Sequence, residues 1–366
     1  MVIFIFSKST WNVFNFRKDL IKALIQKKNK VYILAKKNTN YLDLQQLGCK
    51  ILNINFENDS FNILKDFFAI FKIIKLITIY RPNIFLNFNL KPVILGSFIN
   101  RFFDVTVINT ITGLGNAFLG SEILKKIIIF FYKYSISKNN FVIFHNDVDK
   151  KLFLQKKIVK KNKAHVVKGS GVNINYFKYS KLQKKKITFL FVGRLLWNKG
   201  IKEFIDVSNF YKKNKNIQFC VIGETTKKSS NGITKSFLKK YFLNYNFKYY
   251  PFVNDIRNHI KKSTCVVLPS YREGASKVLL ESASIGRPLM ASRVAGTKGI
   301  VINNYNGYTF KAKNRISLKK TIDKFLKLSF AHKNKMSKNS RYLAVKKFDQ
   351  KYVIQKYIDL INEKKK

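Results

Sequence analysis

Short apolar runs alternate along the chain with longer segments in which apolar and polar residues recur at helical spacing. Val2–Phe6 and Val31–Ala35 have the length of buried strands. Between them we expect a loop at residues 7–15 and an amphipathic helix from about Phe16 to Lys28. Strands that alternate with helices predict a parallel, doubly wound α/β sheet. Further strands of the first half are expected at Lys50–Ile54, Ile84–Phe88, Val105–Asn109, Phe141–Phe144 and His165–Lys168.

The alternation begins again after a lysine-rich stretch at residues 178–186, where we place the boundary between two domains. The first domain is predicted to span residues 1–177 and the second residues 186–345. The tail from Ser337 to Ile361 is expected to form two helices. Strands of the second domain are predicted at Ile187–Val192, Ile217–Ile222, Phe247–Tyr250, Cys265–Leu268 and from Leu289 onward.

The stretch from Leu268 to Ala291 predicts a strand, a loop, a helix and a second strand. The helix opens near Ser276 and ends at Gly286, where glycine can take the left-handed conformation that closes a helix. Glu273 lies in the loop, at the carboxyl end of a strand, which is where ligands bind in open α/β sheets. Glu281 lies inside the helix.

The backbone N–H groups at the start of this helix, at Gly274, Ala275, Ser276 and Lys277, favour an anion such as phosphate. Together with the carboxylate of Glu273, they suit a ligand that carries both hydroxyls and phosphates, such as a nucleotide sugar. The alternative is that Glu273 is a helix-terminal charge and that Glu281 is a solvated helix residue.

A second group of candidate residues follows the strand Ile187–Val192. Gly193 and Arg194 end this strand, and Lys199 and Gly200 precede the next helix. Two cations beside a helix N-terminus suit a diphosphate, because charge-assisted contacts to phosphate are strong.

The first half of the chain carries a glycine loop, in which Thr112, Gly113, Leu114 and Gly115 follow the strand Val105–Asn109. The loop predicts either a close approach of the backbone to a substrate or an ordinary tight turn. Another strand ends in the run from His145 to Asp149, which includes Asn146 and an Asp-x-Asp pattern. We do not interpret this pattern as a metal site, because a hard cation prefers several oxygen ligands and no other acid is close in sequence.

Lysine and arginine together number 71 and the acidic residues 19, which gives a formal net charge of +52. Nucleic acid is therefore the first partner to consider. However, no recognised nucleic-acid motif accompanies the charge, and lysine occurs along the whole chain together with many Asn, Ile and Phe residues. All of these have AT-rich codons, so we attribute the charge mainly to base composition. The charge would still attract the protein to an anionic membrane surface, with each nearby lysine worth about 1 kcal/mol.

Two amphipathic segments have a strongly apolar face. They are Phe67–Tyr80, which Lys72 and Lys75 interrupt, and Ile127–Tyr134, which Lys133 interrupts. Each could pack into a core or lie on a bilayer. No run reaches ~18 uninterrupted apolar residues, the length of a membrane span. The N-terminal run is expected to be a first strand and not a signal peptide, because it lacks a basic n-region.

The three cysteines, Cys49, Cys220 and Cys265, lie far apart, each beside an apolar run. This distribution predicts buried thiols in a reducing compartment, with neither a disulfide framework nor metal-ligand spacing.

Several of these motifs together resemble the retaining glycosyltransferases of family GT4. Glu273 and Glu281 have the spacing of the Glu-x7-Glu signature of that family, and the Gly193-Arg194…Lys199-Gly200 pattern resembles its Gly-Arg…Lys-Gly motif. The resemblance is strongest to bacterial transferases that build lipid-linked oligosaccharides, O-antigen or capsule. Residues that also fit the signature are Pro269, Ser270, Gly274, Leu280, Gly286 and Pro288, and in the first half the Thr110–Gly115 and Gly169–Val172 segments.

The resemblance implies the GT-B fold, in which two Rossmann-like doubly wound domains face a cleft. It also implies that a C-terminal helix at about 350–366 crosses back to the first domain. The first domain would bind the acceptor and the second the nucleotide sugar, expected to be a UDP-sugar. A hexosyl or N-acetylhexosaminyl group would move with retention to a hydroxyl of a polyprenyl-diphosphate-linked saccharide. The enzyme would act as a peripheral protein on the inner, cytoplasmic face of the membrane.

The resemblance also assigns roles to individual residues. Glu273, Arg194 and Lys199 are the expected catalytic residues, with Arg194 and Lys199 holding the donor pyrophosphate. Donor contacts are expected at Gly193, Glu281 and residues 274–277, with Glu281 on the ribose. Neither a metal nor another cofactor is expected. The expected acceptor or cleft residues are Thr112, Gly113, Leu114, Gly115, Asn146 and Gly171.

Two alternatives remain open from the sequence. One is a nucleotide-sugar epimerase or hydrolase of the same fold, which would act on the donor without an acceptor. The other belongs to a different class, a basic nucleic-acid-binding protein, and would require saturable, sequence-selective binding, because salt-dependent binding alone reports only charge.

Overall fold

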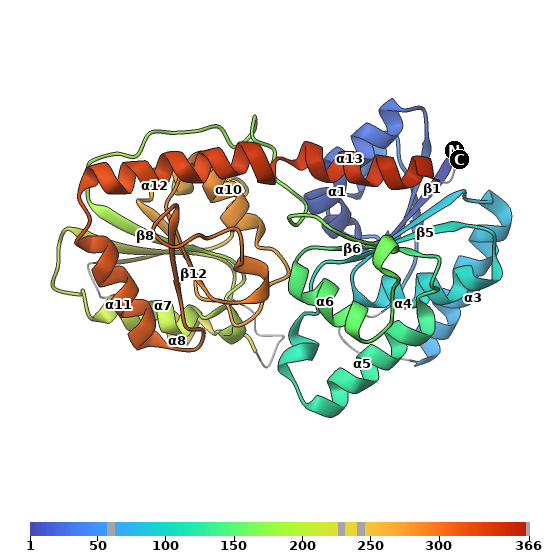
Figure 1. The fold of residues 1–366 in the computed structure, drawn as a ribbon, viewed down its shortest axis with the longest axis horizontal. Coiled ribbons are helices and arrows are strands. Elements are labelled where there is room, and N and C mark those ends of the chain that lie inside the picture. Colours follow the sequence, from blue (N-terminus) through green and yellow to red (C-terminus); the bar gives the residue numbers. More distant parts are fainter. Residues whose placement is uncertain (57–62, 226–230, 240–245, 364–366) are drawn as a thin grey trace. The chain divides into compact units, whose positions relative to one another are not determined.

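The computed structural model of the protein describes residues 1–56, 63–225, 231–239 and 246–363. These residues form two compact units, Met1–Ser170 together with the segment from Lys351 onward, and Gly171–Gln350. Figure 1 shows a β-sheet with helices on both faces in each unit. All described strand pairs are parallel. The prediction of two parallel, doubly wound α/β sheets is therefore confirmed.

The sheet of the first unit has seven strands among the described residues. The strand order reverses beside β1, and at such a switch point ligands bind outside the carboxyl ends of the strands. The order is β3 (Lys50–Asn53), β2 (Lys30–Lys36), β1 (Val2–Ser9), β4 (Ile84–Phe88), β5 (Thr106–Ile111), β6 (Phe141–Phe144) and β7 (Ala164–Val166).

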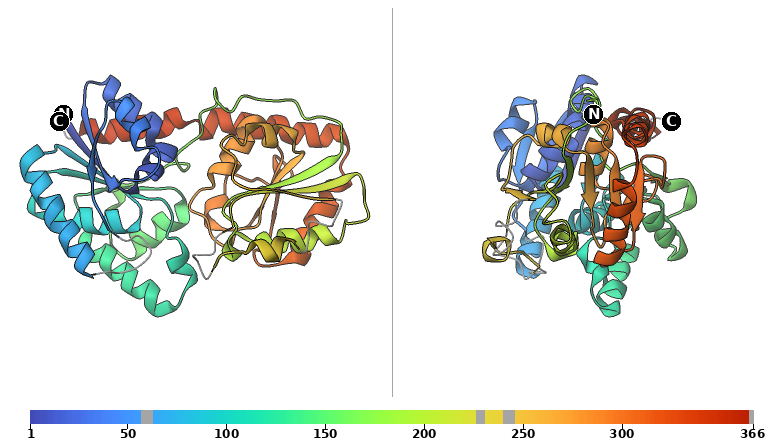
Figure 2. Two further views of the ribbon diagram at one scale, coloured as in Figure 1. Left: turned by 180° about the vertical axis from the view of Figure 1, so that it is seen from behind. Right: turned by 90° about the vertical axis from the view of Figure 1, so that its left-hand side faces the viewer.

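Helices cover both faces of this sheet, and separate apolar clusters hold them there (Figures 1 and 2). One face carries α1 (Thr10–Gln26), α2 (Tyr41–Gln46) and α13 (Gln350–Asn362). The other carries α3 (Ile63–Tyr80), α4 (Leu90–Ile99) with its short extension η1 (Asn100–Phe102), α5 (Glu122–Ser135) and α6 (Asp147–Gln155). The sequence predicts a long amphipathic helix from about Ser60 to Tyr80, and its expected start lies outside the described residues.

The prediction of a loop at residues 7–15 was wrong. β1 continues to Ser9, and α1 begins at Thr10 because the Ser9 side chain caps it by accepting the N–H of Asn12. Three of the polar residues that indicated a loop, Ser7, Thr10 and Asn12, are buried, and Ser7 Oγ donates to Asn12 Oδ1 over 3.0 Å. A polar segment can therefore connect a strand directly to a helix when its buried side chains form hydrogen bonds with one another.

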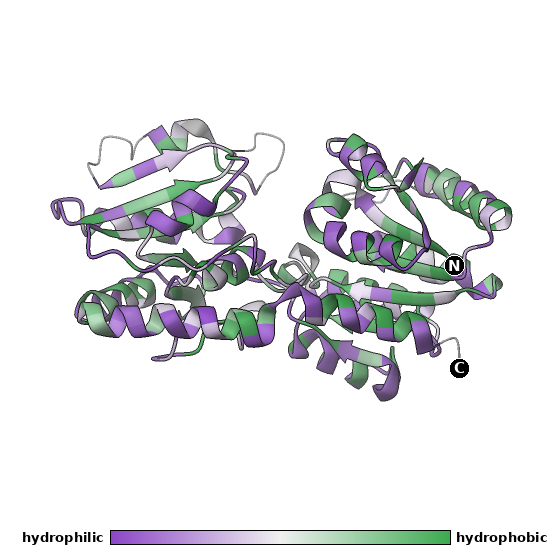
Figure 3. Ribbon diagram, turned by 90° about the horizontal axis from the view of Figure 1, so that it is seen from above, coloured by the Kyte–Doolittle hydropathy of each residue, from purple (hydrophilic) through white to green (hydrophobic). Residues whose placement is uncertain are grey.

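The sheet of the second unit has six strands in the described part of the chain. Their order is β10 (Phe247–Tyr250), β9 (Ile217–Ile222), β8 (Ile187–Val192), β11 (Cys265–Leu268), β12 (Leu289–Ser292) and β13 (Gly307–Phe310). The helices are α7 (Ile201–Asn209), α8 (Lys235–Lys239), α9 (Arg257–Lys262), α10 (Lys277–Ile285), α11 (Arg315–Leu326) and α12 (Phe330–Leu343), which a π-helical turn (Ala344–Phe348) follows. Figure 3 shows hydrophilic and hydrophobic residues alternating around the helices of both units.

Several elements of this unit differ from expectation. β13 and α11 were not predicted. The first helix of the tail begins at Phe330 and not near Ser337, because Ser329 caps it by accepting the N–H of His332. The sequence also predicts a helix at Lys235–Leu243. The structure describes it as far as Lys239, and residues 240–243 lie outside the described residues.

The division between the units falls at Ser170–Gly171, before the predicted boundary at 178–186. The segment that follows Gly171 packs on α10 and so belongs to the second unit. Ser284 Oγ donates to the Phe177 carbonyl over 2.7 Å, and Ser180 N–H donates to the Ile285 carbonyl over 3.0 Å. The lysine-rich composition of residues 178–186 indicated a linker, yet the backbone N–H of Ser180 in this stretch is bonded to α10.

The expected return of the C-terminal helix is confirmed. α13 packs in the core of the first unit through Val353, Tyr357 and Leu360. Its Tyr357 hydroxyl lies 2.7 Å from Oγ1 of Thr110 in β5. In the part of the chain that the structure describes, no helix is long and apolar enough to cross a membrane.

Candidate active site

Three loops of the second unit meet at the carboxyl edge of its sheet. They follow β8, β11 and β12, at residues 193–200, 269–276 and 293–299. Glycine permits their close contact: a Cβ on Gly200 would lie 2.0 Å from the Pro269 carbonyl oxygen, and a Cβ on Gly296 would lie 2.4 Å from the Glu273 carbonyl oxygen. Gly200 also has a φ of +70°, which favours glycine. The loop after β11 therefore packs directly against the loops after β8 and β12.

This packing brings Lys199 and Glu273 together, although they come from separate motifs. Lys199 Nζ lies 2.6 Å from Glu273 Oε1, and their side chains are 23% and 12% exposed. Both groups still reach solvent, and an ammonium has three donors, so Lys199 can hold Glu273 and a ligand oxygen at once. The pair thus offers a cation and a carboxylate at one point.

Glu281 lies inside α10, and only 6% of the residue is exposed. Burial raises the pKa of its carboxyl group to about 7, although Lys277 Nζ, 3.8 Å from Oε1, acts in the opposite direction. The alternative of a solvated helix residue is therefore wrong. A buried carboxyl group with a raised pKa is typical of functional sites.

Ser276 caps the N-terminus of α10, because its Oγ accepts the N–H of Leu279 over 3.4 Å. Gly274 and Ala275 lie in the turn before this cap and are partly buried. At the other end, Gly286 has the predicted left-handed conformation, with a φ of +83°. The positive end of the helix dipole therefore follows Glu273 by a few residues in sequence, and it attracts an anion as the ammonium group of Lys199 does.

Gly193 and Arg194 lie at the end of β8. Arg194 is exposed, so its guanidinium is available to a ligand. The atom nearest to a Cβ on Gly193 would be a ring carbon of Phe191 at 3.8 Å, which is an ordinary contact. The packing of the protein itself therefore leaves room for a side chain at Gly193.

The glycine loop of the first unit follows β5 directly. Gly113 has a φ of +122° and Gly115 a φ of +62°, so both positions favour glycine. Leu114 is buried among residues of α4 and α5 and anchors the loop, whereas Thr112 is partly exposed. No atom of the described residues, apart from those of its chain neighbours, would lie within 4 Å of a Cβ on Gly115, so the space beside this residue is open. The loop is a tight turn that also leaves room for a ligand.

Two other predicted acceptor residues have structural roles. Asn146 caps α6: its Oδ1 accepts the N–H of Asp149 over 2.8 Å, and its Nδ2 donates to Asp149 Oδ2 over 2.9 Å. Gly171 lies in the second unit, where a Cβ would come within 2.4 Å of Gln350 Cα. Capping and close packing therefore account for these two residues without a ligand.

A buried polar cluster in the first unit was not predicted. Arg17 is 4% exposed, and its guanidinium carbon lies 4.2 Å from the centre of the Phe88 ring. His145 and Tyr357 are within electrostatic range of this guanidinium. Burial keeps the pKa of His145 well below its usual range, and the positive charge of Arg17 makes a second, smaller contribution in the same direction. The imidazole is therefore neutral.

The sequence does contain a signal for this cluster. Arg17 falls on the helical spacing of the buried residues Val13, Leu20 and Leu24 of α1. A cation on the apolar stripe of a helix indicates a buried charge, and such charges are rare.

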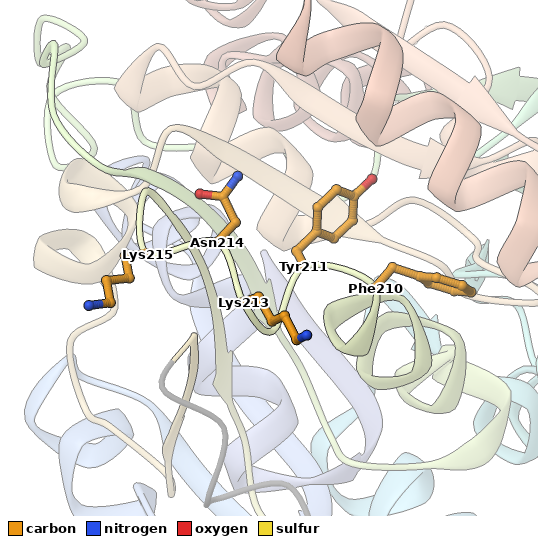
Figure 4. A pocket seen from close by; sticks show the side chains of 5 residues that line it. All are labelled: Phe210, Tyr211, Lys213, Asn214 and Lys215. Carbon is orange, nitrogen blue, oxygen red and sulfur yellow. The ribbon is translucent and has the colours of Figure 1, made fainter.

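The described residues contain no group of three or more His, Cys, Asp or Glu side chains that could hold a metal ion. A surface pocket lies in the connection between α7 and β9, lined by Phe210, Tyr211, Lys213, Asn214 and Lys215 (Figure 4). None of these five residues belongs to the predicted donor site.

Comparison with known proteins places these observations in a family. Residues 173–342 match the model of glycosyl transferases group 1. The chain is 25% identical to N,N'-diacetylbacillosaminyl-diphospho-undecaprenol alpha-1,3-N-acetylgalactosaminyltransferase of Campylobacter jejuni, with 95% of each chain covered. It is 26% identical to UDP-Gal:alpha-D-GlcNAc-diphosphoundecaprenol alpha-1,3-galactosyltransferase of Escherichia coli, with 83% of this chain and 82% of the relative covered.

Solved structures show the same fold. HepE of Anabaena in complex with UDP superposes with a TM-score of 0.80 at 15% identity, over 99% of both chains. WaaG, a glycosyltransferase involved in lipopolysaccharide biosynthesis, superposes with a TM-score of 0.75 at 14% identity, also over 99% of both chains. Residues 173–342 therefore belong to the glycosyl transferases group 1 family, and the chain is a glycosyltransferase with the GT-B fold.

Proposed function

We propose that this glycosyltransferase moves a hexosyl or N-acetylhexosaminyl group, with retention, from a UDP-sugar to a hydroxyl of a polyprenyl-diphosphate-linked saccharide. The binding of a nucleotide-sugar donor is supported by the residues at the carboxyl edge of the sheet in the second unit. There the Lys199–Glu273 pair lies beside the N-terminus of α10, and Glu281 is buried inside that helix. Cations, carboxyl groups and a helix N-terminus together suit a ligand that has both phosphates and hydroxyls.

The relatives support the choice of substrates. The names of the Campylobacter jejuni and Escherichia coli relatives both specify an acceptor that is linked to undecaprenol through a diphosphate, and the second also specifies UDP-Gal as the donor. Both alignments cover more than four fifths of this chain. We extend these two substrate classes to this chain as a proposal, and with them a peripheral position on the inner, cytoplasmic face of the membrane.

In the proposed reaction, the bond between the anomeric carbon and the diphosphate oxygen breaks, and a bond from that carbon to the acceptor oxygen forms. The proton of the acceptor hydroxyl passes to the leaving phosphate, on the same face of the sugar. Negative charge develops on the diphosphate, where Arg194, Lys199 and the amides that precede α10 stabilise it. Glu273 accepts hydrogen bonds from the sugar hydroxyls and Glu281 from the ribose.

These cations supply the charge compensation that a metal would otherwise provide, so we propose transfer without a metal cofactor. In the first unit, the open space beside Gly115 and the partly exposed Thr112 make the glycine loop the proposed acceptor contact.

The test is transfer by purified protein from a panel of UDP-sugars to a synthetic polyprenyl-diphosphate saccharide. Glu281→Gln and Arg194→Ala should each lower kcat/KM at least about 100-fold, because each removes a contact to the donor. Glu363→Gln, at a carboxylate that is 54% exposed near the C-terminus, is the matched control and should stay active. Full transfer by both site variants would refute the site assignment.

The same assay separates the alternatives. Turnover of a UDP-sugar without an acceptor would favour an epimerase or a hydrolase. Sequence-selective, saturable binding of a nucleic acid at physiological salt would favour a nucleic-acid-binding protein.

A further inference from the structure

α3 carries apolar residues on both of its sides. Its inner side packs into the core through Ala69, Ile73 and Ile77. The opposite side forms an outer stripe, at helical spacing, of Leu64, Phe67, Phe68, Phe71 and Ile79, which are 72%, 53%, 71%, 56% and 59% exposed. A helix that packs on one side only normally presents polar residues to water on the other.

α5 repeats this arrangement. Ile128 and Tyr132 pack inward. The outer stripe of α5 consists of Ile123, Ile127, Phe130, Phe131 and Tyr134, which are exposed at successive turns. Phe102 at the end of η1 is 74% exposed and extends this stripe, because its ring lies 5.9 Å from that of Phe98, which stacks on Tyr134 at 6.2 Å.

The two outer stripes belong to one side of the first unit. α3 and α5 cover the same face of the sheet, with α4 between them (Figures 1 and 2). Lys91 of α4 forms an ion pair with Asp66 of α3 at 2.8 Å, and Phe98 of α4 stacks on Tyr134 of α5. Exposed apolar surface of this extent marks a site for a partner or a membrane.

Exposed cations accompany both stripes: Lys65, Lys72 and Lys75 on α3, Lys126 and Lys133 on α5, and Arg101 on η1. The acids on the two helices are held by lysines, Asp66 by Lys91 and Glu122 by Lys125. Asp104, after η1, is exposed as well. The surface therefore combines aromatic side chains with an excess of positive charge, which is the composition of helices that lie on anionic bilayers.

We propose that the outer stripes of α3 and α5 dock the first unit on an anionic lipid bilayer, with the phenyl rings in the acyl boundary and the lysines among the headgroups. A second copy of the chain fits less well, because each copy has a net charge of +52 and like charges repel. The choice of a bilayer also rests on the proposed function, since a polyprenyl-linked acceptor lies in a membrane. Docking on that membrane would bring the glycine loop of the same unit to its substrate.

The test is co-sedimentation of the full-length protein with vesicles of phosphatidylglycerol and phosphatidylcholine, compared with vesicles of phosphatidylcholine alone. A chain this basic adsorbs to anionic vesicles through any face, so the diagnostic variant must keep the charge. The double variant Phe68→Ser/Phe130→Ser keeps it and removes one ring from each stripe. Its partition into phosphatidylglycerol vesicles should fall at least about tenfold at moderate salt.

The matched control is Phe210→Ser/Phe252→Ser, two phenyl rings of the second unit that are 53% and 57% exposed. This control should bind vesicles as the wild type does. Equal binding by the stripe variant and the wild type would overturn the proposal, as would a dimer in solution that the stripe variant abolishes.

Catalysis is measured separately, so that the two proposals can fail independently. The stripe variant should still transfer sugar to an acceptor with a short, water-soluble alkyl tail, while it loses activity on a full-length polyprenyl acceptor in vesicles. Glu281→Gln should bind vesicles normally. Loss of activity on both acceptors by the folded stripe variant would contradict a role limited to docking.

Discussion

The carboxyl group of Glu281 binds its proton more tightly in the folded chain than in the unfolded chain. Burial raises its pKa from 4.5 to about 7. An acid with a raised folded pKa contributes stability below its unfolded pKa, and that contribution is lost as the pH rises through the folded pKa. Between pH 4.5 and about 7 the wild type should therefore lose stability relative to Glu281→Gln, by up to about 3 kcal/mol.

Urea unfolding of both proteins at a series of pH values across this range measures the difference. Glu363→Gln is the control, because the Glu363 side chain is 54% exposed. A difference between the wild type and Glu281→Gln that does not change with pH would show that Glu281 ionises normally in the fold.

The site residues were predictable to different degrees. Lys199 and Glu273 could be named because each belongs to a motif at the end of an apolar run. Their ion pair could not, because it depends on the contact between the loops at Gly200 and Pro269. The burial of Glu281 was also not predictable, because Ser282 and Ser284 beside it are polar and yet buried. Ser284 is satisfied by the carbonyl of Phe177, a residue more than a hundred positions away.

At the scale of elements, α13 links the end of the chain to the strand that carries the glycine loop. The Tyr357 hydroxyl lies 2.7 Å from Thr110 Oγ1, and both side chains are buried. Tyr357→Phe removes this hydrogen bond and leaves the threonine hydroxyl unsatisfied, so it should cost about 1–2 kcal/mol of unfolding free energy. Chemical denaturation at neutral pH measures the loss.

Tyr352→Phe is the matched control on the same helix, because Tyr352 is 46% exposed. It should change stability by less than about 0.5 kcal/mol. Equal stabilities of the two variants would mean that the bond between α13 and β5 contributes nothing to the fold.

Element boundaries were most predictable where an apolar run is continuous and polar residues bound it. β6 and β11 have the predicted limits for this reason. β8, β9 and β10 also have the predicted limits, although Thr188, Gln218 and Lys248 interrupt their apolar runs. The predicted starts of α1 and α12 were wrong, because the sequence does not distinguish the capping residues Ser9 and Ser329 from other polar residues. Their role depends on the backbone N–H group that each side chain accepts in the folded chain. β13 was missed because Gly307 and Thr309 leave no continuous apolar run in its sequence, Gly307–Phe310.

At the scale of the whole molecule, charge repulsion opposes folding. The 19 acidic residues can pair with only some of the 71 basic residues, which leaves an excess of 52 positive charges. Salt screens repulsion between exposed charges, and the Debye length falls from about 10 Å at 0.1 M to about 3 Å at 1 M. Tm should therefore rise by about 2–5 °C between 0.1 and 0.5 M sodium chloride.

Differential scanning calorimetry at constant pH measures this shift. Screening also weakens attractive pairs such as Lys202–Asp206, but surface pairs of this kind contribute little. A Tm that falls with added salt would show that ion pairs outweigh the net repulsion.

The sequence by itself determined the α/β class, the two parallel sheets and the motifs of the donor site, because strand and helix periodicities and short motifs are local properties of the chain. Only the tertiary structure decided which motif residues meet, that Glu281 is buried, that the segment after Gly171 joins the second unit, and that the apolar residues of α3 and α5 divide into an inner face and an exposed stripe. These features depend on contacts between residues far apart in sequence. A helical pattern records that apolar residues share a face, but not whether another part of the chain covers it.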